Sequence, residues 1–211
     1  MIYLASSSPR RRALLKKAGI RFKVFCPTYE ETNDARVSVR MLVKRHALGK
    51  AISASSRIRD GLVLGADTVV VRHGSLSGKP RNMQHAERML QNLQGKWHTV
   101  LTGVALLKIR AGKVVKKTVF VESTAVKLKK LSAEQRKRYL KRIGPLDKAG
   151  AYAIQSKAID IVPPPVRSGR KATGRSCGRT GGGIVERVRG SLANAMGLPM
   201  EKLKKKLGML R

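Results

Sequence analysis

One apolar segment in the first half of the chain constrains the fold more than any other. Residues 62–71 read LVLGADTVVV, and only one acid and one hydroxyl interrupt the run. A continuous Val- and Leu-rich run of this length is typical of a strand buried on both faces at the centre of a sheet. The chain therefore needs other elements to cover that strand, and the segments around it supply them.

Strand and helix patterns mix along the rest of the chain, which indicates an α/β or α+β protein. Further strands are predicted at residues 1–5, 22–26, 99–109 and 114–127, with a short hairpin arm after His73-Gly74. Helices are predicted at residues 9–18, 37–55 and 82–93, from Ser132 to about Ile143, and from Pro199 onward. Residues 147–155 are rich in Gly and Ala and are expected to lead into a short strand.

The first predicted helix begins in a setting suited to phosphate. Residues 4–12 read LASSSPRRR, with Ser8 in position to be the N-cap and Pro9 at the first helical position. Hydroxyl groups, the N–H groups of a first helical turn and the guanidinium groups that include Arg10 and Arg11 then gather at one corner. Such a corner can bind a di- or triphosphate. A capped helix with a basic, solvated face is the alternative interpretation.

Acidic side chains are scarce, so their positions are informative. The chain has 46 Lys and Arg against 12 Asp and Glu, a formal charge of +34. Asp67 lies inside the most apolar strand, where a carboxylate needs a metal, a lysine or a ligand as partner. Glu30 and Glu31 are adjacent, so one of them can point inward. Asp67 with Glu31 can hold a hard cation through oxygen atoms and orient a water molecule.

These residues together form an inventory for cleaving a phosphoanhydride bond. Ser6 and Ser8 offer hydroxyl groups, and Lys50, Lys79 and Lys148 can neutralise phosphate charge. No Walker loop, dinucleotide-binding glycine motif or histidine metal motif competes with this interpretation. The four histidines are scattered and are interpreted as non-catalytic.

Charge and composition limit the other possibilities. The excess of positive charge attracts polyanions, such as nucleic acid, nucleotides or an anionic surface, without naming one. Cys26 and Cys177 have no metal-binding spacing, and no apolar run approaches the length of a membrane span. We therefore expect a reduced, cytoplasmic protein that does not enter membranes.

Taken in order, the motifs resemble the Maf-like nucleotide pyrophosphatases. The resemblance runs nearly end to end and rests on the following segments: LASSSPRR at 4–11, EE at 30–31, A-x-x-KA at 47–51, GADTV at 65–69, GKP at 78–80, PLDKAGAYAIQ at 145–155 and GLP at 197–199. It implies a two-lobed α/β fold like that of the inosine-triphosphate pyrophosphatases, with a central mixed sheet and a cleft between the lobes. The whole chain, residues 1–211, is then one catalytic domain.

The same resemblance assigns roles to the site residues. It implies hydrolysis of a nucleoside triphosphate to the monophosphate and pyrophosphate with a divalent cation, Mg²⁺ or Mn²⁺. Asp67 matches the proton acceptor of the family, while Ser6, Arg11, Glu31, Lys50 and Lys79 match its phosphate- and metal-handling positions. Arg10, Thr68 and Gln155 match the branch that acts on dTTP and UTP, and modified pyrimidine nucleotides stay open as substrates. A homodimer is also implied.

The chain departs from the family pattern near the expected base-binding residue. Ala153 and Ser156 stand where family members usually have glycine, and residues 163–183 are a basic, Gly-rich segment that we interpret as a flexible insertion. These departures and the high charge support a second hypothesis, in which the scaffold has weakened catalysis and binds nucleic acid through charge. Few aromatic residues are present for base stacking, so such binding would be mainly electrostatic.

Overall fold

The computed structural model describes residues 1–32, 34, 36–154 and 183–210. The described chain forms two compact units. The first unit comprises Met1–Val69, Leu101–Ser123 and Ser191–Arg211, and the second comprises Val70–Val100 and Thr124–Gly190. The expected insertion falls almost entirely outside the described residues, as does Gln155.

The strands form one mixed sheet in the order β2-β1-β3-β5-β6-β7, with β4 paired to β3. The pairs of β1 with β2 and β3 are parallel, whereas β3 with β4 and β6 with β7 are antiparallel. The strands are β1 (Ile2–Ala5), β2 (Phe22–Val24), β3 (Gly61–Arg72), β4 (Ser75–Ser77), β5 (Trp97–Arg110), β6 (Lys113–Leu128) and β7 (Val185–Arg189). The predicted α/β class and the central position of the 62–71 strand are confirmed.

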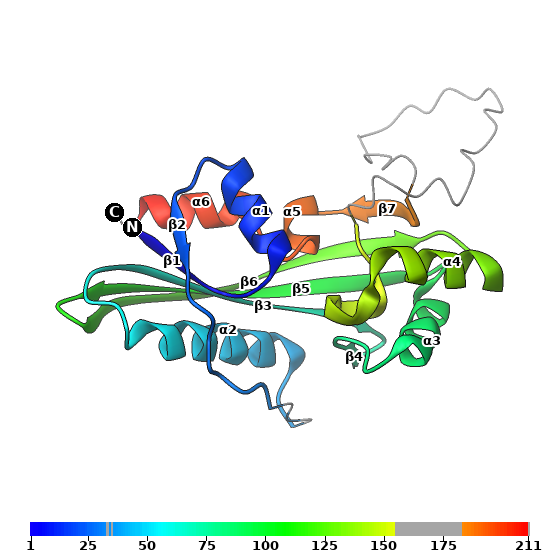
Figure 1. The fold of residues 1–211 in the computed structure, drawn as a ribbon, viewed down its shortest axis with the longest axis horizontal. Helices are drawn as coiled ribbons and strands as arrows, with labels where there is room; N and C mark the ends of the chain where they lie inside the picture. Colours follow the sequence, from blue (N-terminus) through cyan, green and yellow to red (C-terminus); the bar gives the residue numbers. More distant parts are fainter. Residues whose placement is uncertain (33, 35, 155–182, 211) are drawn as a thin grey trace. The chain divides into compact units, whose positions relative to one another are not determined.

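In the first unit, helices cover both faces of the strands. Helices α1 (Pro9–Lys17) and α6 (Met200–Gly208) lie on one side, and α2 (Val39–Ser55) lies on the other (Figure 1). The short helix α5 (Leu192–Ala195) precedes α6. Helix α1 follows β1 and leads to β2, while α2 leads from β2 to β3 on the opposite edge of β1. Strand β1 is therefore a point where the chain reverses its direction across the sheet.

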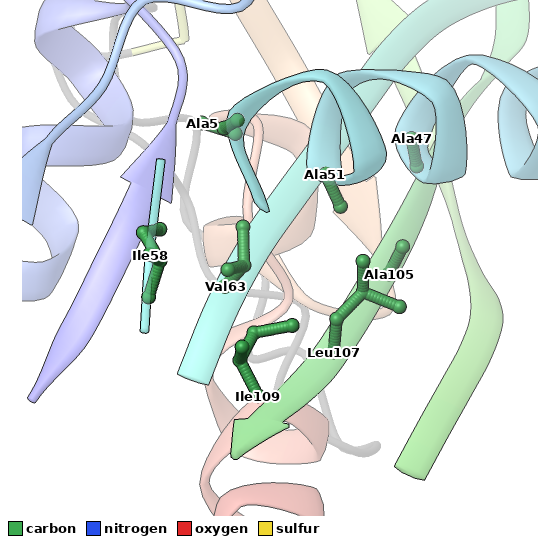
Figure 2. Close-up of a cluster of buried hydrophobic side chains, with 9 residues drawn as sticks. Ala5, Ala47, Ala51, Ile58, Val63, Ala105, Leu107 and Ile109 are labelled. Carbon is green, nitrogen blue, oxygen red and sulfur yellow. The ribbon is translucent and has the colours of Figure 1, made fainter. Parts of the chain in front are cut away.

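Helix α2 packs unusually close to the strands because glycines face it. A Cβ on Gly65 of β3 would lie 2.2 Å from the carbonyl oxygen of Ala47, and one on Gly103 of β5 would lie 2.2 Å from that of Val43. Small and branched side chains fill the remaining layer (Figure 2): Ala5, Ala47, Ala51, Ala54, Ile58, Val63, Ala105, Leu107 and Ile109. This close packing fixes how far a side chain of α2 must reach to touch β3.

The second unit carries α3 (Met83–Leu93), α4 (Ala133–Ile143) and two short 3₁₀ helices, η1 (Pro145–Asp147) and η2 (Ala149–Ala151). The side chain of Asn82 caps α3, and Ser132 with Gln135 forms a capping box on α4. Both helix starts agree with the prediction. The two 3₁₀ helices occupy most of residues 145–154, and the short strand expected to follow residues 147–155 does not begin within the described part of this segment.

A buried histidine–tyrosine pair lies inside the second unit. His98 Nε2 and the hydroxyl of Tyr152 are 2.8 Å apart, and burial lowers the pKa of His98 to about 4. The backbone N–H of Gly150 donates to the carbonyl of Gly78 at 3.0 Å, which ties the η2 turn to the segment after β4. Among the described residues, no helix is both long enough and apolar enough to cross a membrane.

Candidate active site

Polar side chains gather in the first unit at the carboxyl end of β1. Ala5, the last residue of β1, pairs with Gly65, so Asp67 and Thr68 of β3 extend past the end of their parallel neighbour. Because the chain leaves β1 toward opposite edges of the sheet, this end is where open α/β sheets bind ligands.

Strand β3 presents two adjacent polar residues to opposite faces. Asp67 contacts Lys50 of α2, whereas Thr68 contacts Arg11 of α1. Successive side chains of a strand point to opposite faces of its sheet, so the alternation alone places one residue on each side. The result is two polar clusters that share one strand.

The acid cluster consists of Glu31, Lys50 and Asp67. Lys50 Nζ lies 2.7 Å from Asp67 Oδ1 and 2.6 Å from Glu31 Oε1. The side chain of Asp67 is 7% exposed, that of Lys50 11% and that of Glu31 44%. Asp67 Oδ2 is buried and has no hydrogen-bond partner in the described part of the chain. The cluster therefore has an inner carboxylate with one unused acceptor atom and an outer carboxylate that meets solvent.

The arginine cluster consists of Ser6, Arg11 and Thr68. Arg11 is buried and donates from Nη1 to Ser6 Oγ at 3.0 Å and from Nη2 to Thr68 Oγ1 at 3.0 Å. Its Nε donates to the carbonyl oxygen of Gly197 at 2.9 Å. Burial lowers the pKa of Arg11, an effect that the charge of Asp67 opposes. A buried guanidinium held by uncharged oxygen atoms is suited to an anionic ligand.

The start of α1 is as the sequence predicts in position, but different in detail. Ser8 is the N-cap and Pro9 the first helical residue, yet the Ser8 side chain makes no capping hydrogen bond. Instead the Ser8 backbone N–H donates to Ser6 Oγ at 3.2 Å. Ser6 thus links the helix start to Arg11, and Arg10 is the less buried of the two predicted arginines.

Two of the remaining predicted residues belong to the second unit. Lys79 is exposed in the second unit, just after β4. Lys148, also in the second unit, has its Nζ 2.7 Å from the carbonyl oxygen of Gly144 and next to the carboxylate of Asp147. Gln155 is outside the described residues. The structure therefore gathers Glu31, Lys50 and Asp67 in one cluster and Ser6, Arg11 and Thr68 in another.

Several neighbours of these clusters were not predicted as site residues. Thr102 of β5 lies 3.1 Å from Thr68 through their hydroxyl oxygens and donates to the carbonyl of Asn194. The Gly197 carbonyl reaches Arg11 across most of the chain length. His46 of α2 lies one helical turn before Lys50 and is buried. Of these neighbours, only Gly197 belonged to a motif used in the prediction, the GLP motif at residues 197–199.

The donor set of the acid cluster fits a hard divalent cation. Mg²⁺ is usually held by one or two carboxylates together with substrate phosphates and water, and Glu31 with Asp67 supplies such a pair. In the described chain the ammonium of Lys50 bridges these two carboxylates, so their oxygen atoms converge on one positive charge. The described residues contain no group of three or more His, Cys, Asp or Glu side chains arranged to hold a metal ion.

Comparison with protein families identifies the chain. The model of the Maf-like protein family matches residues 1–164. This chain belongs to the Maf-like family. A dTTP/UTP pyrophosphatase of Gloeobacter violaceus is 38% identical over 202 residues, which cover 96% of this chain and 92% of the relative. A dTTP/UTP pyrophosphatase of Dictyoglomus thermophilum is 37% identical over 210 residues, with 99% and 95% covered.

Solved structures of other proteins match this Maf-like chain more distantly. A dITP/XTP pyrophosphatase of Mycobacterium abscessus matches 60% of this chain and 73% of its own, at 14% identity and a TM-score of 0.35. The Ham1 protein of Staphylococcus aureus matches 60% of this chain and 71% of its own, at 12% identity and a TM-score of 0.37.

Proposed function

We propose that this chain hydrolyses dTTP and UTP to the nucleoside monophosphate and pyrophosphate. The observation that carries the proposal is the acid cluster, in which Lys50 Nζ joins a buried and a solvent-facing carboxylate at the carboxyl end of β1. The dTTP/UTP pyrophosphatases that it resembles align with nearly its whole length. Modified pyrimidine nucleotides are further candidate substrates.

Asp67 is the proposed proton acceptor. Its Oδ1 is paired with the ammonium of Lys50, which offsets the cost of burying a carboxylate, and its Oδ2 is an acceptor without a hydrogen-bond partner among the described residues. A water molecule that attacks the α-phosphorus loses a proton to this carboxylate, and the bond to the bridging oxygen breaks to release pyrophosphate. Proton acceptance by a positioned carboxylate accounts for a rate factor of about 10²–10⁴.

The arginine cluster is the proposed binding site for the triphosphate. Arg11 holds its donors in a fixed arrangement through Ser6, Thr68 and the Gly197 carbonyl, so binding an anion costs little reorganisation. The proposal adds Ser8, Arg10, Lys79 and Lys148 as phosphate-binding residues and Gln155, with Thr68, near the base. Lys79 is also proposed to stabilise the charge that develops on the leaving pyrophosphate.

A divalent cation, Mg²⁺ or Mn²⁺, is part of the proposal. Glu31 and Asp67 would hold it, and when bound it neutralises phosphate charge and makes water a better nucleophile. Glu31 meets solvent, so it can take up the cation together with the nucleotide. The ammonium of Lys50 is then available to a phosphate oxygen.

Pyrophosphate release tests the proposed function. The assay uses dTTP, UTP, CTP, GTP and 7-methyl-GTP with Mg²⁺ or Mn²⁺, and compares wild type with Asp67→Asn. The matched control is Glu134→Gln, because Glu134 is an exposed acid whose ion pair is with Arg138 on the surface of α4. We expect turnover of dTTP and UTP that EDTA abolishes and that only Asp67→Asn removes. A folded wild type that is silent on all five nucleotides contradicts the proposal.

Polyanion binding is a second candidate property, supported by one group of lysines. This basic ridge consists of Lys116 of β6 with Lys204 and Lys205 of α6, all exposed; Lys113 and Lys117 are also exposed, on the opposite face of β6. Lys116 Nζ lies 3.3 Å from the Met209 carbonyl oxygen and Lys202 pairs with Glu122 at 3.1 Å, so α6 runs beside β6. No acid pairs with the ridge among the described residues. If the ridge binds nucleic acid, affinity for a short DNA falls at least tenfold between about 50 and 200 mM salt.

Two further features complete the proposal. The homodimer implied by the family resemblance is tested by light scattering on the purified protein. Because nucleoside triphosphates are made and consumed in the cytoplasm, we also propose that location for the chain.

A further inference from the structure

The segment that carries Glu31 is fastened to helix α2 by a neighbouring tyrosine. The ring of Tyr29 lies against Gly49, where a Cβ would come within 2.2 Å of the ring carbon Cε2. Only glycine leaves room for the ring at that position, although glycine inside a helix is unfavourable by about 1 kcal/mol relative to alanine. The close approach therefore needs a reason other than the stability of α2.

A histidine on the same helix holds the other end of the tyrosine. The hydroxyl of Tyr29 lies 3.0 Å from Nδ1 of His46, and the two rings are 5.7 Å apart. His46 is buried, and its Nε2 has no hydrogen-bond partner in the described chain. The hydrogen bond between Nδ1 of His46 and the Tyr29 hydroxyl is thus the contact that orients the tyrosine ring.

These contacts surround the residues of the acid cluster. On α2, His46 precedes Lys50 by one helical turn and Gly49 immediately precedes it. In the other segment, Tyr29 precedes Glu31 by two residues. Residues four apart in a helix lie on the same face, so His46 and Lys50 face the same segment. Glu31 is 44% exposed and makes its ion pair with Lys50 from an irregular segment. Besides Tyr29, the hydrogen bond from Arg45 Nη2 to the Thr32 carbonyl oxygen, at 2.7 Å, ties this segment to α2.

We propose that Tyr29 is a positioning residue for Glu31, seated by Gly49 and oriented by His46. Its role is to hold the outer carboxylate of the acid cluster beside the inner one, so that Glu31 and Asp67 meet the same divalent cation. The inference rests on the proposed function for its catalytic meaning. Its structural content, a dependence of cation affinity on Tyr29, can be measured on protein that turns over no nucleotide.

The sharpest test is Gly49→Ala, with Gly208→Ala as the matched control. A methyl group at Gly49 displaces the tyrosine ring, whereas one at Gly208, also in a helix, meets nothing within 4 Å. Mn²⁺ binding is measured by electron paramagnetic resonance of the free ion. We expect Gly49→Ala to weaken Mn²⁺ binding by about tenfold or more, as loss of a residue that orients a ligand does. Gly208→Ala is expected to bind Mn²⁺ as the wild type does.

Thermal unfolding followed by circular dichroism separates a positioning role from a general loss of folded structure. Alanine favours the helix, so α2 itself is not weakened by Gly49→Ala, and a loss of Mn²⁺ affinity without a loss of helix content supports the proposal. In turnover assays the expected change is a higher Mn²⁺ requirement, with kcat restored at saturating Mn²⁺. Equal Mn²⁺ affinity in Gly49→Ala and wild type overturns the proposal.

A second set of variants probes the hydrogen bond alone and applies even if Gly49→Ala does not fold. Tyr29→Phe and His46→Leu each remove one partner, and each is expected to weaken Mn²⁺ binding by about threefold. The double variant should bind Mn²⁺ no more weakly than the single variant with the larger loss of affinity, because both substitutions break the same hydrogen bond. His46→Asn places an amide nitrogen near the position of Nδ1 and should restore binding. Independent, additive effects overturn the role of the bond.

The outcomes keep this inference apart from the proposed function. Wild type that binds Mn²⁺ and loses affinity in the variants, but hydrolyses neither dTTP nor UTP, contradicts the function and leaves the positioning role in place. Wild type that hydrolyses both nucleotides while the variants keep their Mn²⁺ affinity does the reverse.

Discussion

The two clusters on either side of β3 differ in the charge they leave unbalanced. The acid cluster has the carboxylates of Glu31 and Asp67 around the single ammonium of Lys50. The arginine cluster has a buried guanidinium whose hydrogen bonds go to uncharged oxygen atoms. One cluster therefore favours an added cation and the other an added anion. A nucleoside triphosphate bound with a divalent cation supplies both at once.

Sequence neighbours on one strand connect the two clusters. Asp67 and Thr68 point to opposite faces of β3, so a single backbone segment sets the distance between the cation-binding and anion-binding groups. Gly65 lets α2 approach the strand closely, which brings Lys50 to Asp67. The comparison suggests substitutions that disable one cluster and spare the other.

The largest effect is expected from Asp67→Asn. Loss of the proton acceptor should lower kcat for dTTP by about a thousandfold, since an amide cannot take the proton of the attacking water. Binding of the nucleotide without metal should change little, because the arginine cluster is intact. Stopped-flow or steady-state pyrophosphate release measures the rate, and unchanged kcat removes Asp67 from the mechanism.

The next effect is expected from Lys50→Met. Without the ammonium, two carboxylates face each other with the inner one buried, which we expect to lower the free energy of unfolding by about 3 kcal/mol. Mn²⁺ should restore part of that loss, so the melting temperature should rise more with Mn²⁺ in the variant than in wild type. Differential scanning fluorimetry with and without Mn²⁺ gives the comparison. A variant that Mn²⁺ does not stabilise shows that the carboxylates do not share a cation.

Arg11→Lys should disable the opposite cluster. Lysine keeps the charge but cannot donate in the fixed directions of a guanidinium, so Ser6, Thr68 and the Gly197 carbonyl lose a shared donor. We expect KM for dTTP to rise about ten- to a hundredfold, with Mn²⁺ affinity unchanged. Arg12→Lys, on the exposed face of the same helix, is the matched control. An equal rise in KM for both variants contradicts a specific role for Arg11.

The smallest effect is expected from Thr68→Val. Valine has nearly the same shape but lacks the hydroxyl that accepts from Arg11 Nη2. Loss of one such hydrogen bond costs about 1 kcal/mol, which corresponds to roughly a fivefold rise in KM. Thr118→Val in β6 serves as control. A change in the preference for dTTP over other nucleotides supports the proposed position of Thr68 near the base, and an unchanged KM contradicts the role of this hydrogen bond.

Local signals in the sequence predicted most elements but not their tertiary partners. The predicted starts of α3 at Asn82 and of α4 at Ser132 agree with the structure, in which each of these residues caps its helix through local hydrogen bonds. The helix that begins at Pro9 and the strand at 62–71 were also predicted from local signals, a Ser-Pro start and a continuous apolar run. Helix α5, four residues long, was not predicted, since no periodicity can emerge over so short a segment.

The site followed the same division. The scarcity of acids pointed to Asp67, and its need for a buried partner was met by Lys50, one of the alternatives that the sequence left open. Which arginine would be buried could not be predicted, because the choice of Arg11 over Arg10 depends on Thr68 and Gly197 from distant parts of the chain. The roles of Lys79, Lys148 and Gln155, the residue 163–183 insertion and the cleft between lobes stay predictions.

The most direct test of this account is a crystal structure of the Asp67→Asn variant with dTTP and Mn²⁺. The variant should retain uncleaved nucleotide, and anomalous scattering locates the manganese. We expect the manganese to contact both the Glu31 carboxylate and the side chain of residue 67. We expect phosphate oxygens to accept hydrogen bonds from Arg11. Manganese and triphosphate bound away from both clusters would contradict the division of roles across β3.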